Sequence, residues 1–235
     1  MIKKSPLIID LHKQKNISGT VFKNLKEKKI IIFRNLFKKN EITKELDLFK
    51  KKKFKLTKKS GDYFVGKKNF SRFDKNNKNL SGYARLQYFH TLFTWNKDES
   101  FRKIFKKVIK FRNKLYNIKS YKNNIFKFKN DNYFNLPKVN YLPARGHLGS
   151  HIDLSDKQER NFVVIMSKID RDFSKGGFFI IKNKKLLNIE KDLEIGDIIC
   201  NDVNTYHGVE KIFCNKNQIG RYSLVLSMRK VVGSF

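Results

Sequence analysis

The sequence has few of the residues that define several common protein classes. Two cysteines, Cys200 and Cys214, in 235 residues make neither a disulfide framework nor a zinc cluster. No apolar run approaches the ~20 residues of a membrane-spanning helix, and the apolar stretch Leu7–Ile9 is too short for the core of a signal peptide. We therefore expect a protein without a membrane span, in a reducing, cytoplasmic setting.

Acidic residues are also scarce. Asp and Glu number 21 against 53 Lys and Arg, which gives a formal net charge of +32. Such a balance usually indicates a polyanionic partner, either nucleic acid or an acidic membrane surface. However, 43 of the basic residues are Lys and 10 are Arg, and Lys lacks the planar fork with which Arg reads guanine edges. Lys, Asn, Ile and Phe also share AT-rich codons, so base composition explains part of the excess, and a nucleic-acid partner is disfavoured.

The remaining composition predicts a folded protein with one core. With 40% hydrophobic and 14% aromatic residues the chain can bury a sizeable core, and its length favours a single domain over residues 1–235. The first half, 1–124, has mainly helical patterns and one strand, which we interpret as support for a core that follows. Its predicted elements are helices over 21–28, 40–51 and 99–117, a buried strand over Lys29–Arg34, and a lid or loop region over 52–95.

Residues 125–235 change from helical to strand periodicity. Short β-branched and aromatic runs alternate there with turn signals rich in Gly and Asn. Strands at such spacing are typical of a sandwich, jelly roll or barrel, so we expect a mainly β core carrying the chemistry, backed by the N-terminal helices. The predicted strands are Phe126/Phe128, 138–142, 161–166, 178–182, 198–202 and 221–229.

A candidate metal site lies in this second half. His151 and Asp153 are two residues apart, so on a strand both side chains project from one face. His207 can supply a second imidazole from another strand. Two His and one carboxylate on one face of an octahedral ion leave three open positions, an arrangement suited to non-haem Fe(II) that binds a chelating co-substrate and dioxygen together.

A second motif follows downstream of His207. Arg221 and Ser223 again form a same-face pair on a predicted strand. If the His207 and Arg221 strands form a hairpin that turns near residues 215–217, Arg221 lies about four residues along the sheet from His207, or ~13 Å. An extended Arg side chain and a five-carbon diacid can span that distance, which makes the spacing compatible with 2-oxoglutarate.

The stretch from about Lys138 to Arg229 resembles the Fe(II)/2-oxoglutarate-dependent oxygenase superfamily. That superfamily has a double-stranded β-helix (jelly-roll, cupin-like) core in which a His-x-Asp pair, Gly-Gly and Gly-Asp turns, a distal His and an Arg-x-Ser pair occur in this order. The N-terminal segment Lys29–Leu36, followed by a helix, is also similar to the superfamily's N-terminal strand. The matching core segments are Asn140–Asp153, Gly176–Ile181, Gly196–Cys200, Tyr206–Val209 and Arg221–Ser223.

The resemblance implies a cofactor set and a reaction. His151, Asp153 and His207 would bind Fe(II), while Arg221 with Ser223 would hold the distal carboxylate of 2-oxoglutarate. 2-Oxoglutarate and O2 would be co-substrates, converted to succinate and carbon dioxide as an unactivated C–H is hydroxylated. Related halogenases have Gly or Ala in place of the carboxylate ligand, so Asp153 favours a hydroxylase, and desaturation stays open.

Four further residues are candidates for the site, each with a competing structural role. Tyr141 could hydrogen-bond the co-substrate or face the other side of its strand as core. Arg145 and Asn140 lie near the predicted mouth of the barrel, where Arg145 could pair with a substrate carboxylate or be solvated. His147 could contact substrate, although a polar loop histidine is the simpler interpretation.

Three functions compete. The leading hypothesis is a hydroxylase of a small molecule, such as an amino acid or another biosynthetic intermediate. The second is the same chemistry on a macromolecule, a protein side chain or a nucleic-acid base. Nucleic-acid dealkylases of the superfamily end in an Arg-x-Asn-x-x-x-Arg motif, from which this chain departs at Ser223 and Arg229. The third is a non-enzymatic basic jelly-roll binding module.

Overall fold

The fold is that of a computed structural model that describes most of the chain. The described residues are 6–13, 17, 21, 23–25, 27, 30–51, 70–73, 84–91, 101–118, 133–153, 162–202 and 204–230. Within them no helix is long and apolar enough to cross a membrane.

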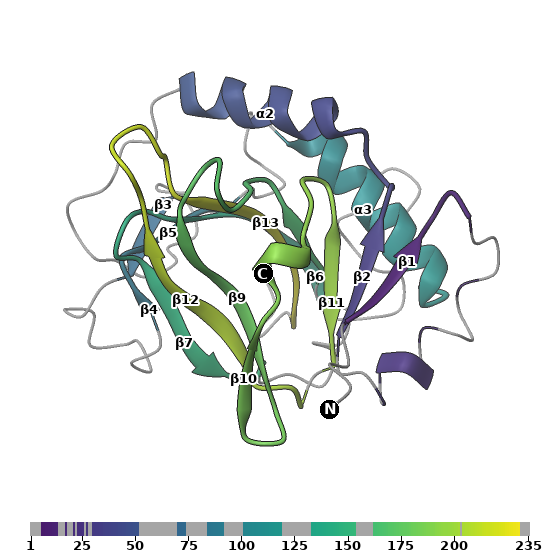
Figure 1. The fold of residues 1–235 in the computed structure, drawn as a ribbon. Helices are drawn as coiled ribbons and strands as arrows, with labels where there is room; N and C mark the ends of the chain where they lie inside the picture. The colour runs from purple at the N-terminus through teal and green to yellow at the C-terminus, as the bar shows by residue number, and fades with distance from the viewer. Residues whose placement is uncertain are drawn as a thin grey trace.

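Two β-sheets form the core of the molecule, with two helices packed outside one of them (Figure 1). All the strand pairs are antiparallel except the first, between β1 and β2. The larger sheet has the order β1 (Leu7–Asp10), β2 (Ile30–Arg34), β11 (Ile198–Asn201), β8 (Phe162–Ile165), β13 (Arg221–Lys230), β6 (Tyr133–Leu142), β5 (Gln87–Thr91), β3 (Phe70–Phe73). The smaller sheet has the order β10 (Lys185–Asn188), β9 (Lys175–Lys182), β12 (His207–Phe213), β7 (His147–His151), β4 (Ala84–Arg85).

Strand β2 is buried on both faces, by the helices on one side and by the smaller sheet on the other. Ile31 and Phe33 belong to the apolar cluster on the helical side, whereas Ile30 and Ile32 belong to the cluster shared with the smaller sheet. Because side chains alternate along a strand, a strand buried on both faces is a continuous apolar run rather than an alternating one. The predicted strand over Lys29–Arg34 is therefore an interior strand of the larger sheet, between β1 and β11.

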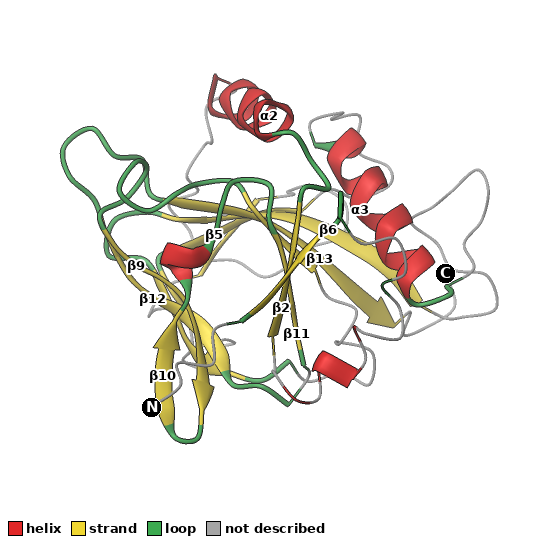
Figure 2. Ribbon diagram, turned by 45° about the vertical axis from the view of Figure 1, so that its right-hand side comes forward, coloured by secondary structure: helices red, strands yellow, loops and turns green. Residues whose placement is uncertain are grey.

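The helices close the outer face of the larger sheet (Figure 2). Helix α2 spans Lys39–Lys51 and helix α3 spans Arg102–Leu115, close to two of the predicted ranges, and residues 21, 23–25 and 27 of the third are also helical. The inner face of α3 is built from Ile104, Phe105, Val108 and Ile109, all buried, at the three- and four-residue spacing of an amphipathic helix.

Two structural findings modify the expectations. The interval 52–95, interpreted as lid or loop, includes strands β3, β4 and β5, which extend both sheets. Tyr88, one of the aromatic residues of this interval, packs within the larger sheet, where its ring lies 6.0 Å from that of Tyr141. The predicted strand at Phe126/Phe128 lies outside the described residues. Strand β10 and its hairpin with β9 were not predicted, because β10 is exposed throughout and has no apolar face.

The predicted hairpin between the His207 and Arg221 strands is wrong. Strand β12 pairs with β7 and β9 in the smaller sheet, whereas β13 pairs with β6 and β8 in the larger one. The connection crosses between the layers, where the N–H groups of Ile219 and Gly220 both donate to the carbonyl oxygen of Asp172. His207 and Arg221 therefore approach one another from facing sheets rather than along one sheet.

Candidate metal centre and co-substrate cavity

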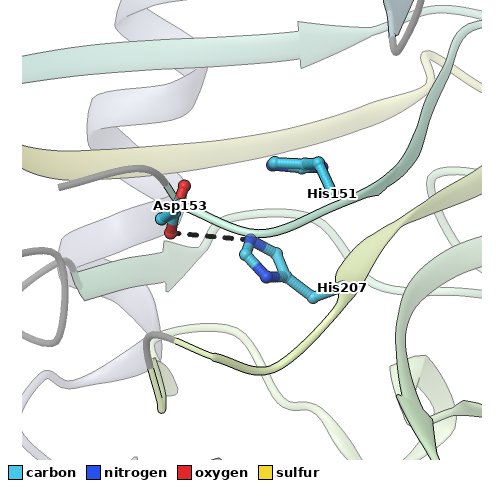
Figure 3. A group of neighbouring side chains, drawn as sticks. All are labelled: His151, Asp153 and His207. Carbon is cyan, nitrogen blue, oxygen red and sulfur yellow. Dashed lines mark ion pairs between the residues drawn. The ribbon is translucent and has the colours of Figure 1, made fainter.

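Three predicted ligands come together between the sheets. His151 ends β7, His207 begins β12 directly opposite it, and Asp153 follows β7 by two residues. One nitrogen or oxygen atom from each lies within 4.8 Å of the others. Asp153 Oδ2 is 3.7 Å from His207 Nε2 (Figure 3), and the two imidazole rings are 4.5 Å apart.

Backbone carbonyl groups orient both imidazoles. The Nδ1 atom of His151 lies 2.9 Å from the carbonyl oxygen of Gly149, and that of His207 lies 2.9 Å from the carbonyl oxygen of Thr205. Each contact favours the tautomer in which Nδ1 carries the hydrogen, which leaves the lone pair on Nε2. Both histidines are thus prepared to act as ligands through Nε2.

Burial also keeps His207 in the form that binds a metal. Removal from water lowers the pKa of His207, an effect that the Asp153 carboxylate opposes and the neighbouring His151 imidazole reinforces. Phe178 stacks against its ring at 5.9 Å. A neutral imidazole is the ligand form, because protonation occupies the lone pair.

Arg221 lies in the same cavity as the triad. The cavity has a volume of about 220 Å³ and is lined by residues of both sheets. Arg221 is 2% exposed, and its Nε donates to both carboxylate oxygens of Glu190 at 3.0 Å. Its Nη2 atom is buried without a hydrogen-bond partner. A buried cationic donor that is unsatisfied beside a metal-ligand triad fits an anionic group that binds between them.

The other predicted site residues are divided between the cavity and its surroundings. Ser223 and Asn140 line the cavity from adjacent positions on β13 and β6, with Asn140 Nδ2 3.5 Å from Ser223 Oγ. Tyr141 is on the other face of β6, stacked on Tyr222 at 4.3 Å, and burial raises its pKa to about 12. Arg145 is on an exposed turn, and His147 on β7 is outside the set of cavity-lining residues.

Two charged residues of the site were missed by the sequence analysis. Glu190, on the 3-10 helix η2 (Glu190–Asp192), pairs with Arg221. Lys138, on β6, is buried and lines the cavity. No motif marks Glu190, because it reaches Arg221 from 31 residues away. The sequence did indicate the position of Lys138. It stands two residues before Asn140 on the same predicted strand, and strand alternation places both side chains on the same face.

The donor set fits iron and 2-oxoglutarate. Two imidazole nitrogens and one carboxylate form the facial triad of non-haem Fe(II) oxygenases and leave open positions for other ligands. The unpartnered Nη2 of Arg221 fits the second carboxylate of a diacid that chelates the metal through its other end. The three candidate ligands and Arg221 all lie in the part of the chain that the structure describes.

No family model matches the sequence, and no curated protein matches it. Several solved structures are similar to the chain. A prolyl-4-hydroxylase of Pseudomonas putida is similar with a TM-score of 0.58 at 8% identity, over 91% of this chain and 99% of the other. A prolyl hydroxylase of Trichoplax adhaerens, in complex with a peptide of hypoxia inducible factor, is similar with a TM-score of 0.58 at 14% identity. This match covers 92% of this chain and 90% of the other.

A third similar structure is an oxidoreductase of the 2OG-Fe(II) oxygenase family from Burkholderia pseudomallei. It has a TM-score of 0.53 and 13% identity, and the match covers 98% of each chain. Identities this low establish similarity of fold and leave activity to the residues of the site. The chain has the jelly-roll fold of the 2-oxoglutarate- and Fe(II)-dependent oxygenases, and on that fold it carries a His-Asp-His triad.

Proposed function

We propose that the protein is an Fe(II)- and 2-oxoglutarate-dependent dioxygenase that hydroxylates an unactivated C–H group of a small molecule. The observation that carries this proposal is the presence of His151, Asp153, His207 and Arg221 around one cavity. A jelly roll that served only as a binding module would need no such combination.

The residues have separate roles. The Nε2 atoms of His151 and His207 and the carboxylate of Asp153 would hold Fe(II). When bound, Fe(II) with 2-oxoglutarate and O2 supplies the oxidative decarboxylation to succinate and the hydroxylation of the substrate. The unpartnered Nη2 of Arg221 would hold the distal carboxylate of 2-oxoglutarate, and the Ser223 hydroxyl would donate to the same group.

Apolar side chains form part of the cavity wall. Phe178, Val163 and Val209 line it from three strands of the two sheets. An apolar wall near the triad lowers the local dielectric constant, which strengthens the interaction of Arg221 with a carboxylate.

The size of the cavity favours a small substrate group. About 220 Å³ lies below the ~300–1,000 Å³ of typical ligand pockets, so after 2-oxoglutarate has bound there is room for a small molecule or for the tip of a side chain. The alternative of a protein substrate has one observation in its favour, namely that two of the similar structures are prolyl hydroxylases. The test of function therefore includes both substrate classes.

Succinate formation tests the proposal. Protein loaded with Fe(II) is supplied with 2-oxoglutarate and O2 and screened against amino acids, other small carboxylic acids, nucleosides and proline-containing peptides. We expect substrate-stimulated succinate formation and stoichiometric Fe(II) binding, both lost in His207→Ala and Asp153→Ala and both kept in His12→Ala, an exposed histidine outside the cavity. Loaded protein that neither binds 2-oxoglutarate nor forms succinate would refute it.

A further inference from the structure

We infer that Gln87 is a positioning residue of the 2-oxoglutarate site. Through Asn140 it directs the Ser223 hydroxyl toward the distal carboxylate of the co-substrate. The inference rests on the proposed function and deepens it, because it adds to the same cavity a residue that no sequence motif includes. It also assigns Asn140 to the co-substrate rather than to the substrate.

The three residues form a polar row across neighbouring strands of the larger sheet. Strands β5, β6 and β13 lie side by side (Figure 1), and all three residues line the cavity. Ser223 pairs directly with Asn140. Phe89 pairs with Asn140 from the other side, so Gln87, two residues before Phe89 and on the same face, is a diagonal neighbour of Asn140. Diagonal neighbours on one face of a sheet are within reach of long side chains.

The chain changes sheets immediately before Gln87. Strand β4 belongs to the smaller sheet and β5 to the larger one, and Leu86 between them has a φ of +51°. A left-handed backbone is unfavourable for a residue with a bulky side chain. Beyond this corner the side chains alternate, so that Gln87 lines the cavity while Tyr88 packs near Tyr141 on the other face. The corner therefore fixes the direction of the Gln87 side chain.

Burial makes the hydrogen bonds of this row necessary. The exposed fractions are 3% for Gln87, 5% for Asn140 and 1% for Ser223. The Nε2 atom of Gln87 lies 3.1 Å from Oδ1 of Asn140, and Nδ2 of Asn140 lies 3.5 Å from Oγ of Ser223. Because a buried polar group that loses its partner destabilises the fold, the three side chains hold one another in place.

The row of hydrogen bonds has one direction. A side-chain amide has a donor end and an acceptor end. Gln87 donates to the oxygen of Asn140, which turns the NH2 group of Asn140 toward Ser223. Ser223 Oγ then accepts a hydrogen bond, and among the described residues it has no other partner. The hydroxyl hydrogen of Ser223 is therefore available to a ligand.

Arg221 supplies the second donor for that ligand. It precedes Ser223 by two residues on β13, so the two side chains project from the same face, with ~7 Å between their positions along the strand. Nη2 of Arg221 is buried without a hydrogen-bond partner. Two donors on one face of a cavity fit the two oxygens of a carboxylate. A Ser223 hydroxyl turned toward Asn140 would leave that carboxylate to Arg221 alone.

The first experiment compares two 2-oxo acids. 2-Oxoglutarate and 2-oxopentanoate have the same five-carbon chain and the same metal-chelating end, and 2-oxopentanoate lacks the distal carboxylate. Their dissociation constants are measured anaerobically on Fe(II)-loaded protein from the visible absorption of the chelate. Wild type should prefer 2-oxoglutarate by more than about a hundredfold, the effect of two charge-assisted contacts. Ser223→Ala should reduce this preference by about tenfold and Gln87→Met by about threefold.

Affinity for 2-oxopentanoate separates positioning from a general structural effect. Because Gln87 is expected to act on the distal carboxylate, Gln87→Met should change the dissociation constant of 2-oxopentanoate by less than about twofold. Equal weakening of both acids would show that the substitution disturbs the whole cavity and would overturn the inference.

A double-mutant cycle tests whether Gln87 acts through Ser223. In a Ser223→Ala background Gln87→Met should change the preference by less than about 1.5-fold, since the hydroxyl that it directs is absent. Asn140→Leu, a second variant that breaks the row, should reduce the preference by about threefold on its own and should add nothing to Ser223→Ala. A loss of the same size in both backgrounds would refute the inference.

A glutamine outside the cavity provides the matched control. Gln218 accepts the N–H of Asn215 in an exposed turn, and Gln218→Met should keep the wild-type preference; a threefold loss there would refute a specific role of Gln87. If wild type binds neither 2-oxo acid in the presence of Fe(II), the proposed function falls. Calorimetric titration of metal-free protein with glutarate then decides the inference. Weaker binding in both Ser223→Ala and Gln87→Met supports it, whereas no binding, or equal binding in all three proteins, refutes it.

Discussion

At the scale of single residues, the buried ion pair between Arg221 and Glu190 orients the guanidinium in the cavity. Both side chains are almost completely buried, with 2% and 1% exposed. Glu190 also accepts the N–H of Phe178 at 2.5 Å. Gly177 makes room for it, because a Cβ atom there would lie 2.4 Å from that of Glu190 on a backbone with a φ of +115°. Glu190 thus positions the guanidinium through Nε and leaves Nη2 available to a ligand.

Replacing Glu190 by Gln should destabilise the protein strongly. The substitution leaves the buried Arg221 without its counter-charge, and breaking a buried ion pair in this way costs about 3–5 kcal/mol. Urea denaturation followed by circular dichroism measures the free energy of unfolding. Addition of 2-oxoglutarate to metal-loaded protein should restore more stability to this variant than to wild type, since its carboxylate compensates the same guanidinium.

Glu194→Gln is the matched control for this prediction. Glu194 pairs with Lys168, and the two side chains are partly exposed, at 44% and 33%. Exposed ion pairs contribute at most about 1 kcal/mol, so the control should unfold close to wild type. An equal loss in both variants would mean that the Arg221–Glu190 pair has no special structural role.

Residue types and spacing predicted the metal ligands but not the charges around them. His151 and Asp153 share a face by strand alternation alone, and His207 required only a second strand. The pairing of Arg221 with Glu190 depends on where η2 lies against β13, which no local pattern encodes. The orientation of Tyr141 away from the cavity likewise follows from the register of β6 with β13, and a shift of one residue reverses every side chain.

At the scale of elements, the start of helix α2 shows how a side chain stabilises a helix end. Glu41 is in the first turn of the helix, and its carboxylate accepts the N–H of Lys38 at 2.9 Å. Lys107 of α3 lies 3.3 Å from the same carboxylate. The Lys38 hydrogen bond, followed by the Lys107 contact, holds the pKa of Glu41 below its ordinary value, against an opposing effect of burial.

This lowered pKa predicts a stability effect that depends on pH. A carboxyl whose pKa is lower in the folded state stabilises it above the unfolded pKa, and the stabilisation is lost as pH falls through the folded pKa. Glu41→Gln should therefore reduce the free energy of unfolding by about 0.5 kcal/mol at pH 7, where Glu41 is ionised. At about pH 2.5 the difference should vanish. Urea titrations at both pH values measure it, with Glu27→Gln, an exposed residue, as the control; a difference that persists at low pH would contradict it.

The positions of helices and strands were predicted more accurately than the pairing of the strands. The helices over 40–51 and 99–117 and the strands near 162–165, 198–201 and 221–230 match the structure because hydrophobic periodicity marks them. The pairing of β12 with β7 and β9 depends on how the chain crosses between the two layers after Phe213. The turn residues 215–217 are compatible with a hairpin or with a crossing, so sequence alone did not separate them.

At the scale of the whole molecule, the charge of +32 is a property of the surface more than of the site. Most of the buried cavity wall is neutral, and Lys138 and Arg221 are its described cations. Among the residues that the structure describes, most of the other Lys side chains are exposed, such as those along α2 and α3. Such a surface produces a long-range positive potential, which attracts anions to the protein and weakens as salt shortens its range.

This potential predicts that salt weakens the apparent affinity for 2-oxoglutarate. The co-substrate is a dianion that approaches through a field whose range falls from ~30 Å at 0.01 M to ~10 Å at 0.1 M ionic strength. The KM for 2-oxoglutarate should rise by about tenfold between these two ionic strengths while kcat stays constant. Salt weakens the long-range attraction that brings the dianion to the protein, but not the buried contacts with Arg221. Steady-state succinate formation at several ionic strengths measures both constants, and the KM for O2, a neutral co-substrate, provides the internal control. A KM for 2-oxoglutarate that does not change with salt would leave the basic excess as a consequence of base composition, without a role in attracting ligands.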